Sequence, residues 1–192
     1  MTRIIAGRAK GVRLAAPKSG TRPTSDRVRE ALFSTLGTWF GTADRPTEQQ
    51  LEGVAVLDLY AGTGAIALEA ASRGAGPVAA VDSHTAALIA ANAQKAGLIL
   101  DVRGGSVEGT LPPGPWDLVF VDPPYDLESG VLDRVLEPLF APGRLNPQAL
   151  MIVERSKRAD PPVWPRDLDD SWTRHYGETT LHFAATRPAG ET

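Results

Sequence analysis

The chain has 192 residues, a net charge of −3 and no cysteine. A single domain of this length can bury a real hydrophobic core, and the lack of cysteine excludes disulfides and thiolate metal sites. The three histidines are not spaced like metal ligands, so we expect no metal. The sequence has no signal peptide and no apolar run long enough to span a membrane, so we expect a cytoplasmic protein, with a monomer as the default.

Basic residues are concentrated near the N-terminus. Residues 1–29 contain eight basic side chains and one acidic side chain, whereas the rest of the chain has 12 basic and 22 acidic ones. A basic arm on an acidic body is typical of a protein that binds a polyanion such as RNA. Residues 3–5 and 12–14 alternate like the strands of a small hairpin, which favours an ordered arm over a disordered tail. The residues that we expect to contact RNA are Arg3, Arg8, Lys10, Arg13 and Arg22.

The segment after this arm predicts a helix. Thr24 or Ser25 can cap its N-terminus, and apolar residues recur every three or four positions across residues 28–39. The apolar stripe should pack on the body of the protein. We expect at least one of Arg27 and Arg29 to lie on a solvated helix face.

Residues 54–74 combine a strand, a glycine turn and a helix. Residues 54–59 are apolar and partly β-branched, and residues 65–74 are rich in alanine and end in glycine. Between them, Gly62 and Gly64 permit a tight turn and close approach of a ligand to the start of the helix.

The following strand, residues 77–81, ends in Asp82, which can bind the two ribose hydroxyls of a nucleoside. This arrangement suits a nicotinamide dinucleotide and S-adenosylmethionine alike. Asp58, at the end of the first strand, favours S-adenosylmethionine, because a carboxylate repels a pyrophosphate but attracts an ammonium and a sulfonium.

A second motif, Asp122-Pro123-Pro124-Tyr125, follows a buried strand over residues 116–121. Ligands of an open parallel sheet bind beyond the carboxyl ends of its strands. Asp122 can accept a hydrogen bond from an amino group, the prolines present rigid, unpartnered carbonyls, and Tyr125 offers a stacking face. This set fits an aromatic ring with an exocyclic amino group. The alternative is an ordinary proline-rich turn.

The remaining segments complete a sheet. Helices are predicted over residues 83–96 and 131–137, and strands over residues 98–102, 149–154, 172–176 and 179–185, of which the last two form an antiparallel hairpin. Ser106 could hydrogen-bond the edge of an adenine, with Val107 against the ring. A plain turn serine is an equally open interpretation.

Together, Leu57–Gly64 and Asp122–Tyr125 resemble the motifs of class I S-adenosylmethionine-dependent methyltransferases that act on amino nitrogens. Arg3–Gly7 and Gly20–Phe33 narrow this resemblance to the RsmD family, and it covers about residues 2–154. The resemblance implies methylation of guanine N2 in 16S ribosomal RNA, within a partly assembled small ribosomal subunit. It also implies that the corner before the first helix borders the cofactor pocket.

We therefore expect an α/β fold of the Rossmann-like class I methyltransferase type. It should have a mostly parallel seven-stranded sheet, helices on both faces and a C-terminal antiparallel hairpin. A basic β-hairpin extension over residues 1–22 should precede a catalytic domain over residues 23–192. The residues expected to bind the cofactor are Thr24, Asp58, Tyr60, Gly62, Gly64, Asp82, Ser83, Ser106, Val107 and Asp122. Those expected to act on the substrate are Asp122, Pro123 and Tyr125.

Other functions remain open from the residues alone. One is methylation of adenine N6 or cytosine N4 in DNA or RNA, for which asparagine in place of Asp122 would be more familiar. A nicotinamide dehydrogenase is disfavoured by Asp58 and by the base-stacking motif. A ribosome assembly factor without catalytic activity would not need the full set of site residues.

Overall fold

The computed structural model describes residues 2–17, 25–124, 127–165 and 168–188. Seven strands form one sheet in the order β3-β2-β1-β4-β5-β7-β6. Their bounds are β1 (Val56–Leu59), β2 (Val78–Asp82), β3 (Asp101–Gly104), β4 (Trp116–Val121), β5 (Leu145–Ser156), β6 (Asp170–Tyr176) and β7 (Thr179–Ala185). The first five strands are parallel, and β7 is antiparallel to both β5 and β6. The mostly parallel sheet with a C-terminal antiparallel hairpin is thus confirmed.

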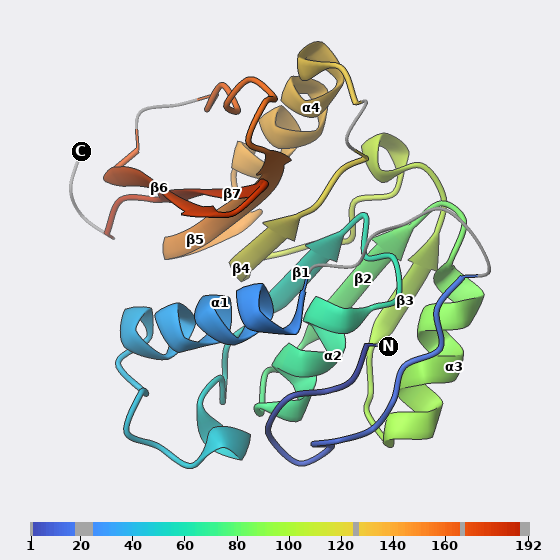
Figure 1. Cartoon of the computed structure of the whole chain (residues 1–192). Coiled ribbons are helices and arrows are strands. Elements are labelled where there is room, and N and C mark those ends of the chain that lie inside the picture. The colour runs from blue at the N-terminus through green and yellow to red at the C-terminus, as the bar shows by residue number, and fades with distance from the viewer. Residues whose placement is uncertain (1, 18–24, 125–126, 166–167, 189–192) are drawn as a thin grey trace.

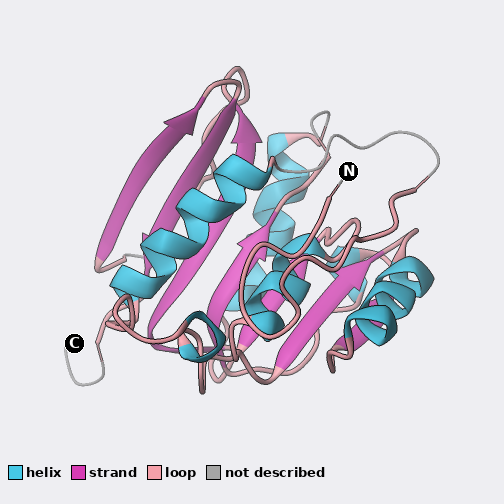
Figure 2. Ribbon diagram, turned by 60° about the horizontal axis from the view of Figure 1, so that its bottom comes forward, coloured by secondary structure: helices cyan, strands magenta, loops and turns pink. Residues whose placement is uncertain are grey.

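Helices cover both faces of the sheet (Figures 1 and 2). In the described part of the chain, the α-helices are α1 (Asp26–Trp39), α2 (Ala65–Ser72), α3 (Ala86–Ala96) and α4 (Ser129–Leu136), and the short 3-10 helices are η1 (Thr47–Gln49), η2 (Val107–Gly109) and η3 (Glu137–Phe140). One hydrophobic cluster lies under α1, α2 and α3, and a second lies under α4 on the opposite face. The strand order reverses between β1 and β4, which is where such sheets bind ligands.

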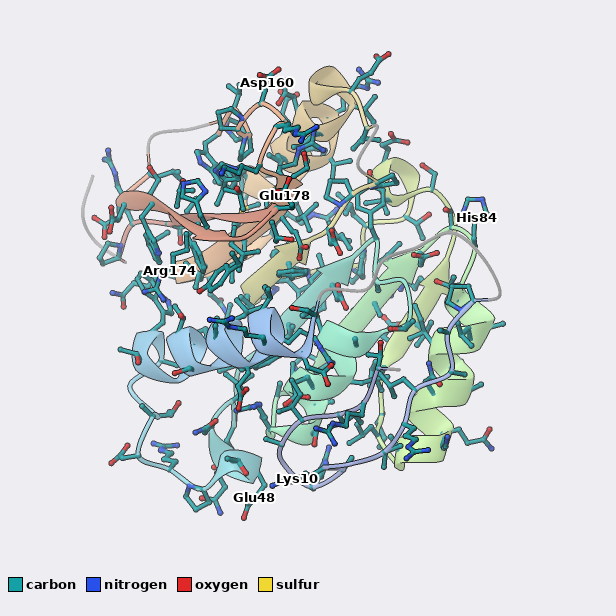
Figure 3. The ribbon with its side chains drawn as sticks, in the orientation of Figure 1. Lys10, Glu48, His84, Asp160, Arg174 and Glu178 are labelled. Carbon is teal, nitrogen blue, oxygen red and sulfur yellow. The ribbon has the colours of Figure 1, made fainter. Side chains whose placement is uncertain are left out.

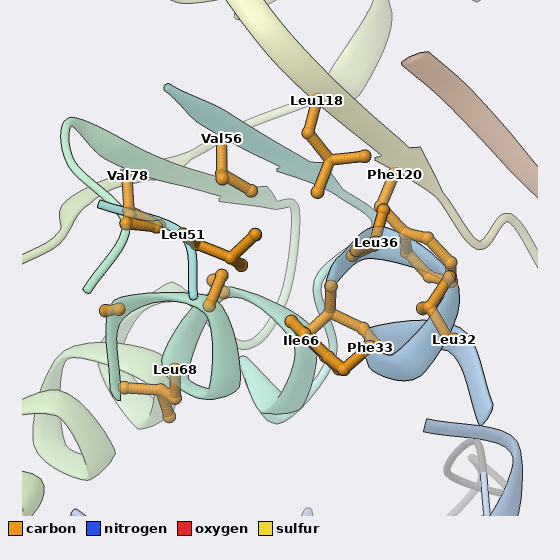
Figure 4. Packing of buried hydrophobic residues seen from close by; sticks show 14 of the residues in the cluster. Leu32, Phe33, Leu36, Leu51, Val56, Ile66, Leu68, Val78, Leu118 and Phe120 are labelled. Carbon is orange, nitrogen blue, oxygen red and sulfur yellow. The ribbon is translucent and has the colours of Figure 1, made fainter. Parts of the chain in front are cut away.

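The apolar stripe of α1 packs on the sheet as expected. Figure 4 shows Leu32, Phe33 and Leu36 of this helix against Ile66 of α2 and Phe120 of β4. All five side chains are at least 95% buried. Since burying one such side chain contributes about 1.5–3 kcal/mol, this contact holds α1 against the sheet.

Several element bounds differ from the expected ones. Helix α1 does begin after its predicted cap, because Ser25 Oγ accepts a hydrogen bond from the N–H of Val28 (3.3 Å), whereas Thr24 and Arg22 lie outside the described residues. Helix α3 begins at Ala86 and not at residue 83, and β3 begins at Asp101 and not at residue 98.

The basic arm folds back on itself without forming regular strands. A single antiparallel bridge joins Arg3 and Arg13, and the N–H of Ile4 donates to the carbonyl of Val12 (3.0 Å). The expected hairpin is therefore reduced to one bridge. Ile4 and Leu14 are buried in the cluster under α1–α3, so the arm is packed against the body of the protein.

A buried carboxylate anchors this arm. Glu69 of α2 is fully buried and accepts hydrogen bonds from the N–H groups of Ile5 (2.6 Å) and Ala6 (3.0 Å). It also accepts one from Arg73 Nε (2.9 Å), one helical turn further on. Because a buried charge is stable only when it is paired and hydrogen-bonded, the sequence of α2 holds the arm in one place.

Candidate active site

The glycine turn after β1 has the backbone conformation that its sequence predicts. Gly62 and Gly64 have φ angles of 56° and 76°, and Tyr60 also lies in the left-handed region, with φ 59°. Left-handed geometry at a residue with a side chain costs about 1–2 kcal/mol, so the fold holds Tyr60 in a strained position. Gly64 is the N-cap residue of α2, and the turn therefore presents its backbone at the start of that helix.

Gly62 and Gly64 differ in what surrounds them. A Cβ atom on Gly64 would lie 2.8 Å from Cγ2 of Ile89 on α3, whereas one on Gly62 would meet only the carbonyl oxygen of Tyr60, at 4.0 Å. Gly64 thus allows α2 and α3 to pack closely. Gly62 leaves open space above the turn, where a ligand can approach the backbone.

Asp82 connects this turn with α3. Its Oδ2 accepts a hydrogen bond from the N–H of Gly62 (3.0 Å), and its Oδ1 accepts from the N–H groups of His84 (2.8 Å) and Thr85 (2.9 Å). Burial alone would raise the pKa of Asp82, but the hydrogen bonds from His84 and Gly62 outweigh it, so the pKa lies below its usual value. A carboxylate has about four lone-pair sites, so Asp82 can take one ribose hydroxyl without giving up a backbone contact.

Asp58 is almost completely buried beneath the same turn. Its side chain is 1% exposed, and Oδ2 accepts a hydrogen bond from the N–H of Ala67 in the first turn of α2 (3.0 Å). Burial raises the pKa of Asp58 to about 7, the N–H of Ala67 lowers it, and the charge of Asp82 raises it again. The carboxylate therefore exchanges its proton near neutral pH, and a nearby cation would favour its ionised form.

The second motif lies beside the glycine turn. The N–H of Asp122 donates to the carbonyl of Leu59 (3.2 Å), which ties the end of β4 to the end of β1. Asp122 is half-buried and Pro123 is buried. The expectation that both proline carbonyls lack partners is wrong for Pro124, whose carbonyl accepts a hydrogen bond from the N–H of Leu127 (3.0 Å). Tyr125 lies outside the described residues.

The remaining residues expected to bind the cofactor differ in exposure and in the contacts that they make. Ser83 is exposed, and its Oγ lies 2.6 Å from Nδ1 of His84. Ser106 is exposed and donates to Oε2 of Glu108 (2.7 Å). Val107 is 3% exposed and belongs to the cluster under α4, so its side chain packs inside the protein. Burial, and then the charge of Glu108, raises the pKa of Tyr60 to about 12, which keeps the phenol a hydrogen-bond donor.

The four described arm residues are exposed, but they do not lie at the carboxyl edge of the sheet. The N–H of Arg8 donates to the carbonyl of Ser72 at the end of α2 (2.9 Å). In Figure 3, Lys10 lies far from His84, which follows the carboxyl end of β2. Arg3 and Arg13 lie opposite each other in the antiparallel bridge. The basic side chains of the arm therefore lie near the end of α2 (Arg8), beside α3 (Arg13) and at the start of α1 (Arg3).

Two buried residues that sequence reasoning missed hold these parts together. Asn92 of α3 accepts from the N–H of Ala15 (2.8 Å) and donates to the carbonyls of Ala15 (3.1 Å) and Thr63 (3.0 Å), which joins the arm to the glycine turn. Arg29 is fully buried, and its Nη2 donates to the carbonyl of Arg3 (2.8 Å) and to Asp26 (2.7 Å). A lone polar residue on an otherwise apolar helix face is the signal that could have identified each. Of the two arginines in question, Arg27 is the exposed one.

Two further properties concern the described residues only. They contain no group of three or more His, Cys, Asp or Glu side chains placed to hold a metal ion. They also contain no helix that is both long enough and apolar enough to cross a bilayer.

Comparison with known families gives the chain its context. The family model described as conserved hypothetical protein 95 matches residues 2–185. Ribosomal RNA small subunit methyltransferase D of Escherichia coli strain K12 is 35% identical over 179 residues, which cover 90% of this chain and 82% of that protein. The chain belongs to the RsmD family. The protein of the same name from Haemophilus influenzae is 31% identical over 188 residues, covering 93% of this chain and 88% of the other.

Solved structures place the fold among class I methyltransferases. The yhhF protein of Escherichia coli superposes with a TM-score of 0.76 and 29% identity, covering 96% of this chain and 97% of that one. The 16S rRNA N2 G1207 methyltransferase (RsmC) of Thermus thermophilus, in complex with AdoMet and guanosine, gives a TM-score of 0.63 at 21% identity. It covers 88% of this chain and 44% of its own. The expected family and the expected fold class are thus confirmed.

Proposed function

We propose that this member of the RsmD family transfers a methyl group from S-adenosylmethionine to N2 of a guanine in 16S ribosomal RNA. Support comes from the relatives named ribosomal RNA small subunit methyltransferase D. The fold is also that of an RsmC structure that holds AdoMet and guanosine. Among the features of this chain itself, one contact carries the proposal.

That contact is the hydrogen bond from the N–H of Asp122 to the carbonyl of Leu59 (3.2 Å). Leu59 immediately precedes the turn formed by residues 60–64. The bond therefore sets the acceptor carboxylate of the second motif beside the turn that would hold the cofactor. A substrate amine on Asp122 and a methyl donor above the turn would be neighbours, as in-line transfer requires.

The residues around the turn fit S-adenosylmethionine better than a dinucleotide. Asp58 and Asp82 place two carboxylates below and beside the turn, which suits an ammonium, a sulfonium and a ribose hydroxyl but repels a pyrophosphate. The open space over Gly62 leaves room for a ligand against the backbone. When bound, S-adenosylmethionine supplies an electrophilic methyl group.

In this mechanism Asp122 and the carbonyl of Pro123 accept the two hydrogens of the guanine amino group. The N2 lone pair is otherwise delocalised into the ring, so holding both hydrogens prepares the nitrogen to pyramidalise. The new N–C bond then forms as the S–C bond breaks, and Asp122 takes the proton or passes it to water. Orientation supplies most of the acceleration, up to ~7–11 kcal/mol relative to a bimolecular encounter. Tyr125 is the proposed stacking platform for the extruded base.

The basic extension over residues 1–22 is proposed to contact the RNA backbone, and residues 23–192 to form the catalytic domain. Exposed Arg8, Lys10 and Arg13 can neutralise phosphates near α2 and α3, and exposed Arg3, which pairs with Asp26 at the start of α1 (3.7 Å), can add a further cation there. Arg22 and Thr24 are proposed to border the cofactor pocket. The expected substrate is 16S ribosomal RNA within a partly assembled small subunit.

The test is transfer of labelled methyl from S-adenosylmethionine to naked 16S RNA, small-subunit particles and duplex DNA, with digestion and identification of the modified nucleoside. We expect N2-methylguanosine from the RNA or the particles. Methyladenine or methylcytosine would overturn the target, and cofactor binding without any transfer would favour an assembly factor.

A variant pair then tests the mechanism. Asp122→Ala should lower the rate of transfer by about 10²–10⁴-fold while cofactor affinity stays largely intact. The exposed Asp160→Ala should match the wild type in both measurements. Near-normal turnover by Asp122→Ala would refute this mechanism.

A further inference from the structure

A second carboxylate lies next to Asp122, and the mechanism above does not use it. Glu154 of β5 is 3% exposed and has an interaction partner within the protein. Burying a carboxylate is costly, and polar side chains at the carboxyl ends of central strands face the ligand site of such sheets. Glu154 is therefore a candidate for a role toward the substrate.

The pairing of β4 with β5 places the two carboxylates together. Phe120 pairs with Ile152, and Val121 pairs with Val153, in parallel register. Phe120 and Ile152 both face the cluster under α1–α3.

Side chains alternate between the two faces of a sheet, so Asp122 and Glu154, two residues further along each strand, point to this same face. The Asp122 N–H continues the pairing of β4 with β1, so the strand geometry extends to this position. Neighbouring strands lie about 4.8 Å apart, which sets the spacing of the two side chains at their bases.

This arrangement matches the edge of guanine. Guanine presents the N1–H next to its N2 amino group, so two donors lie side by side. Adenine and cytosine present a ring nitrogen acceptor next to their amino groups. We propose that Glu154 accepts a hydrogen bond from the N1–H of the target guanine while Asp122 holds the N2 amino group. This inference rests on the function proposed above.

The depth of the two residues agrees with an extruded base that enters with its Watson–Crick edge first. Asp122 is half-buried, whereas Glu154 is almost wholly buried. A carboxylate offers two oxygens and about four lone-pair sites, so Glu154 can bind N1–H alongside its partner in the protein. An adenine in the same place would direct the N1 lone pair at the carboxylate, and that repulsion selects against it.

The test compares guanine with 2-aminopurine at the target position, in small-subunit particles reconstituted with the two RNAs. 2-Aminopurine keeps the exocyclic amino group but has an acceptor at N1. We expect the wild type to prefer guanine by about tenfold to a hundredfold in kcat/KM, the usual range for one hydrogen bond to a charged group. In Glu154→Gln the amide can donate to N1 of 2-aminopurine, so the preference should fall to near unity or reverse.

The ratio of the two substrates on one enzyme preparation is the readout that a merely structural role would not change. The exposed Glu178→Gln, on the turn between β6 and β7, is the matched control and should keep the wild-type ratio (Figure 3). If Glu154→Gln does not fold, Glu154→Asp keeps the charge and should keep the preference for guanine at a lower rate.

Two failures can be told apart. If the wild type does not methylate guanine N2, the proposed function is overturned. If it does, but Glu154→Gln keeps the wild-type preference, or Glu154→Asp loses it, this inference alone is overturned.

Discussion

Alanine at the two glycines of the turn should affect different properties, chiefly stability at Gly64 and chiefly cofactor binding at Gly62. In Gly64→Ala, the left-handed conformation costs about 1–2 kcal/mol, and the new Cβ would lie 2.8 Å from Cγ2 of Ile89. Overpacking of this kind adds about 1–3 kcal/mol, for a total near ~2–5 kcal/mol. At ~2–4 °C per kcal/mol for a chain of this size, the melting temperature should fall by about 4–20 °C.

Gly62→Ala is the matched control, because its Cβ would have no contact closer than 4.0 Å. Its free energy of unfolding should fall only by the cost of the left-handed conformation, about 1–2 kcal/mol. It should weaken binding of S-adenosylmethionine more than this stability loss suggests, since the methyl group enters the proposed ligand space. Calorimetry of unfolding and titration with cofactor measure the two effects. Equal losses of stability in the two variants would refute the assignment of Gly64 to packing and Gly62 to ligand approach.

Three further outcomes are expected. Cofactor affinity should rise as pH increases through about 7, because burial raises the pKa of Asp58 and a cation binds its ionised form. Because the folded pKa is raised, the contribution of Asp58 to stability should fall as pH rises from the pKa of the unfolded chain to about 7. Asp58→Asn should flatten the dependence of cofactor affinity on pH. Glu69→Ala should lose about 3–5 kcal/mol of unfolding free energy and make the arm cleavable in limited proteolysis. Neutralising Arg8, Lys10 and Arg13 should flatten the salt dependence of RNA binding, whereas an unchanged slope would show that they do not touch phosphate.

The core of the fold could be predicted because its signals are local. The strand predicted over residues 54–59 and the helix predicted over residues 65–74 follow from short-range rules, and the structure has them as β1 (Val56–Leu59) and α2 (Ala65–Ser72). Strand β5 was predicted from residue 149 but begins at Leu145. Gln148 adopts a left-handed φ of 61° where the pairing with β4 shifts register. An irregularity of this kind depends on the partner strand and has no local signature.

The site was predictable in its residues but not in their contacts. Asp82 was chosen for its distance from the glycines, yet the N–H of Gly62 already occupies one of its oxygens. Glu69 and Asn92 were missed because each binds backbone groups of the arm that are more than 60 residues away in sequence. The spacing of residues along one helix or strand predicts which of them lie on the same face. It does not report which distant backbone group those residues satisfy.

The distribution of charge separates two surfaces, an acidic carboxyl edge of the sheet and a basic arm. The carboxyl edge of the sheet gathers Asp58, Asp82, Asp122 and Glu154, a setting that repels a phosphate backbone but accepts cations and amino groups. In the arm, Arg8 lies at the end of α2, and Lys10 lies far from His84 at that edge. If the arm binds RNA phosphates as proposed, the acidic edge would admit only a base of that RNA. The proposed nucleotide would then have to leave its stack, and it would present a neutral, donor-rich edge to the carboxylates.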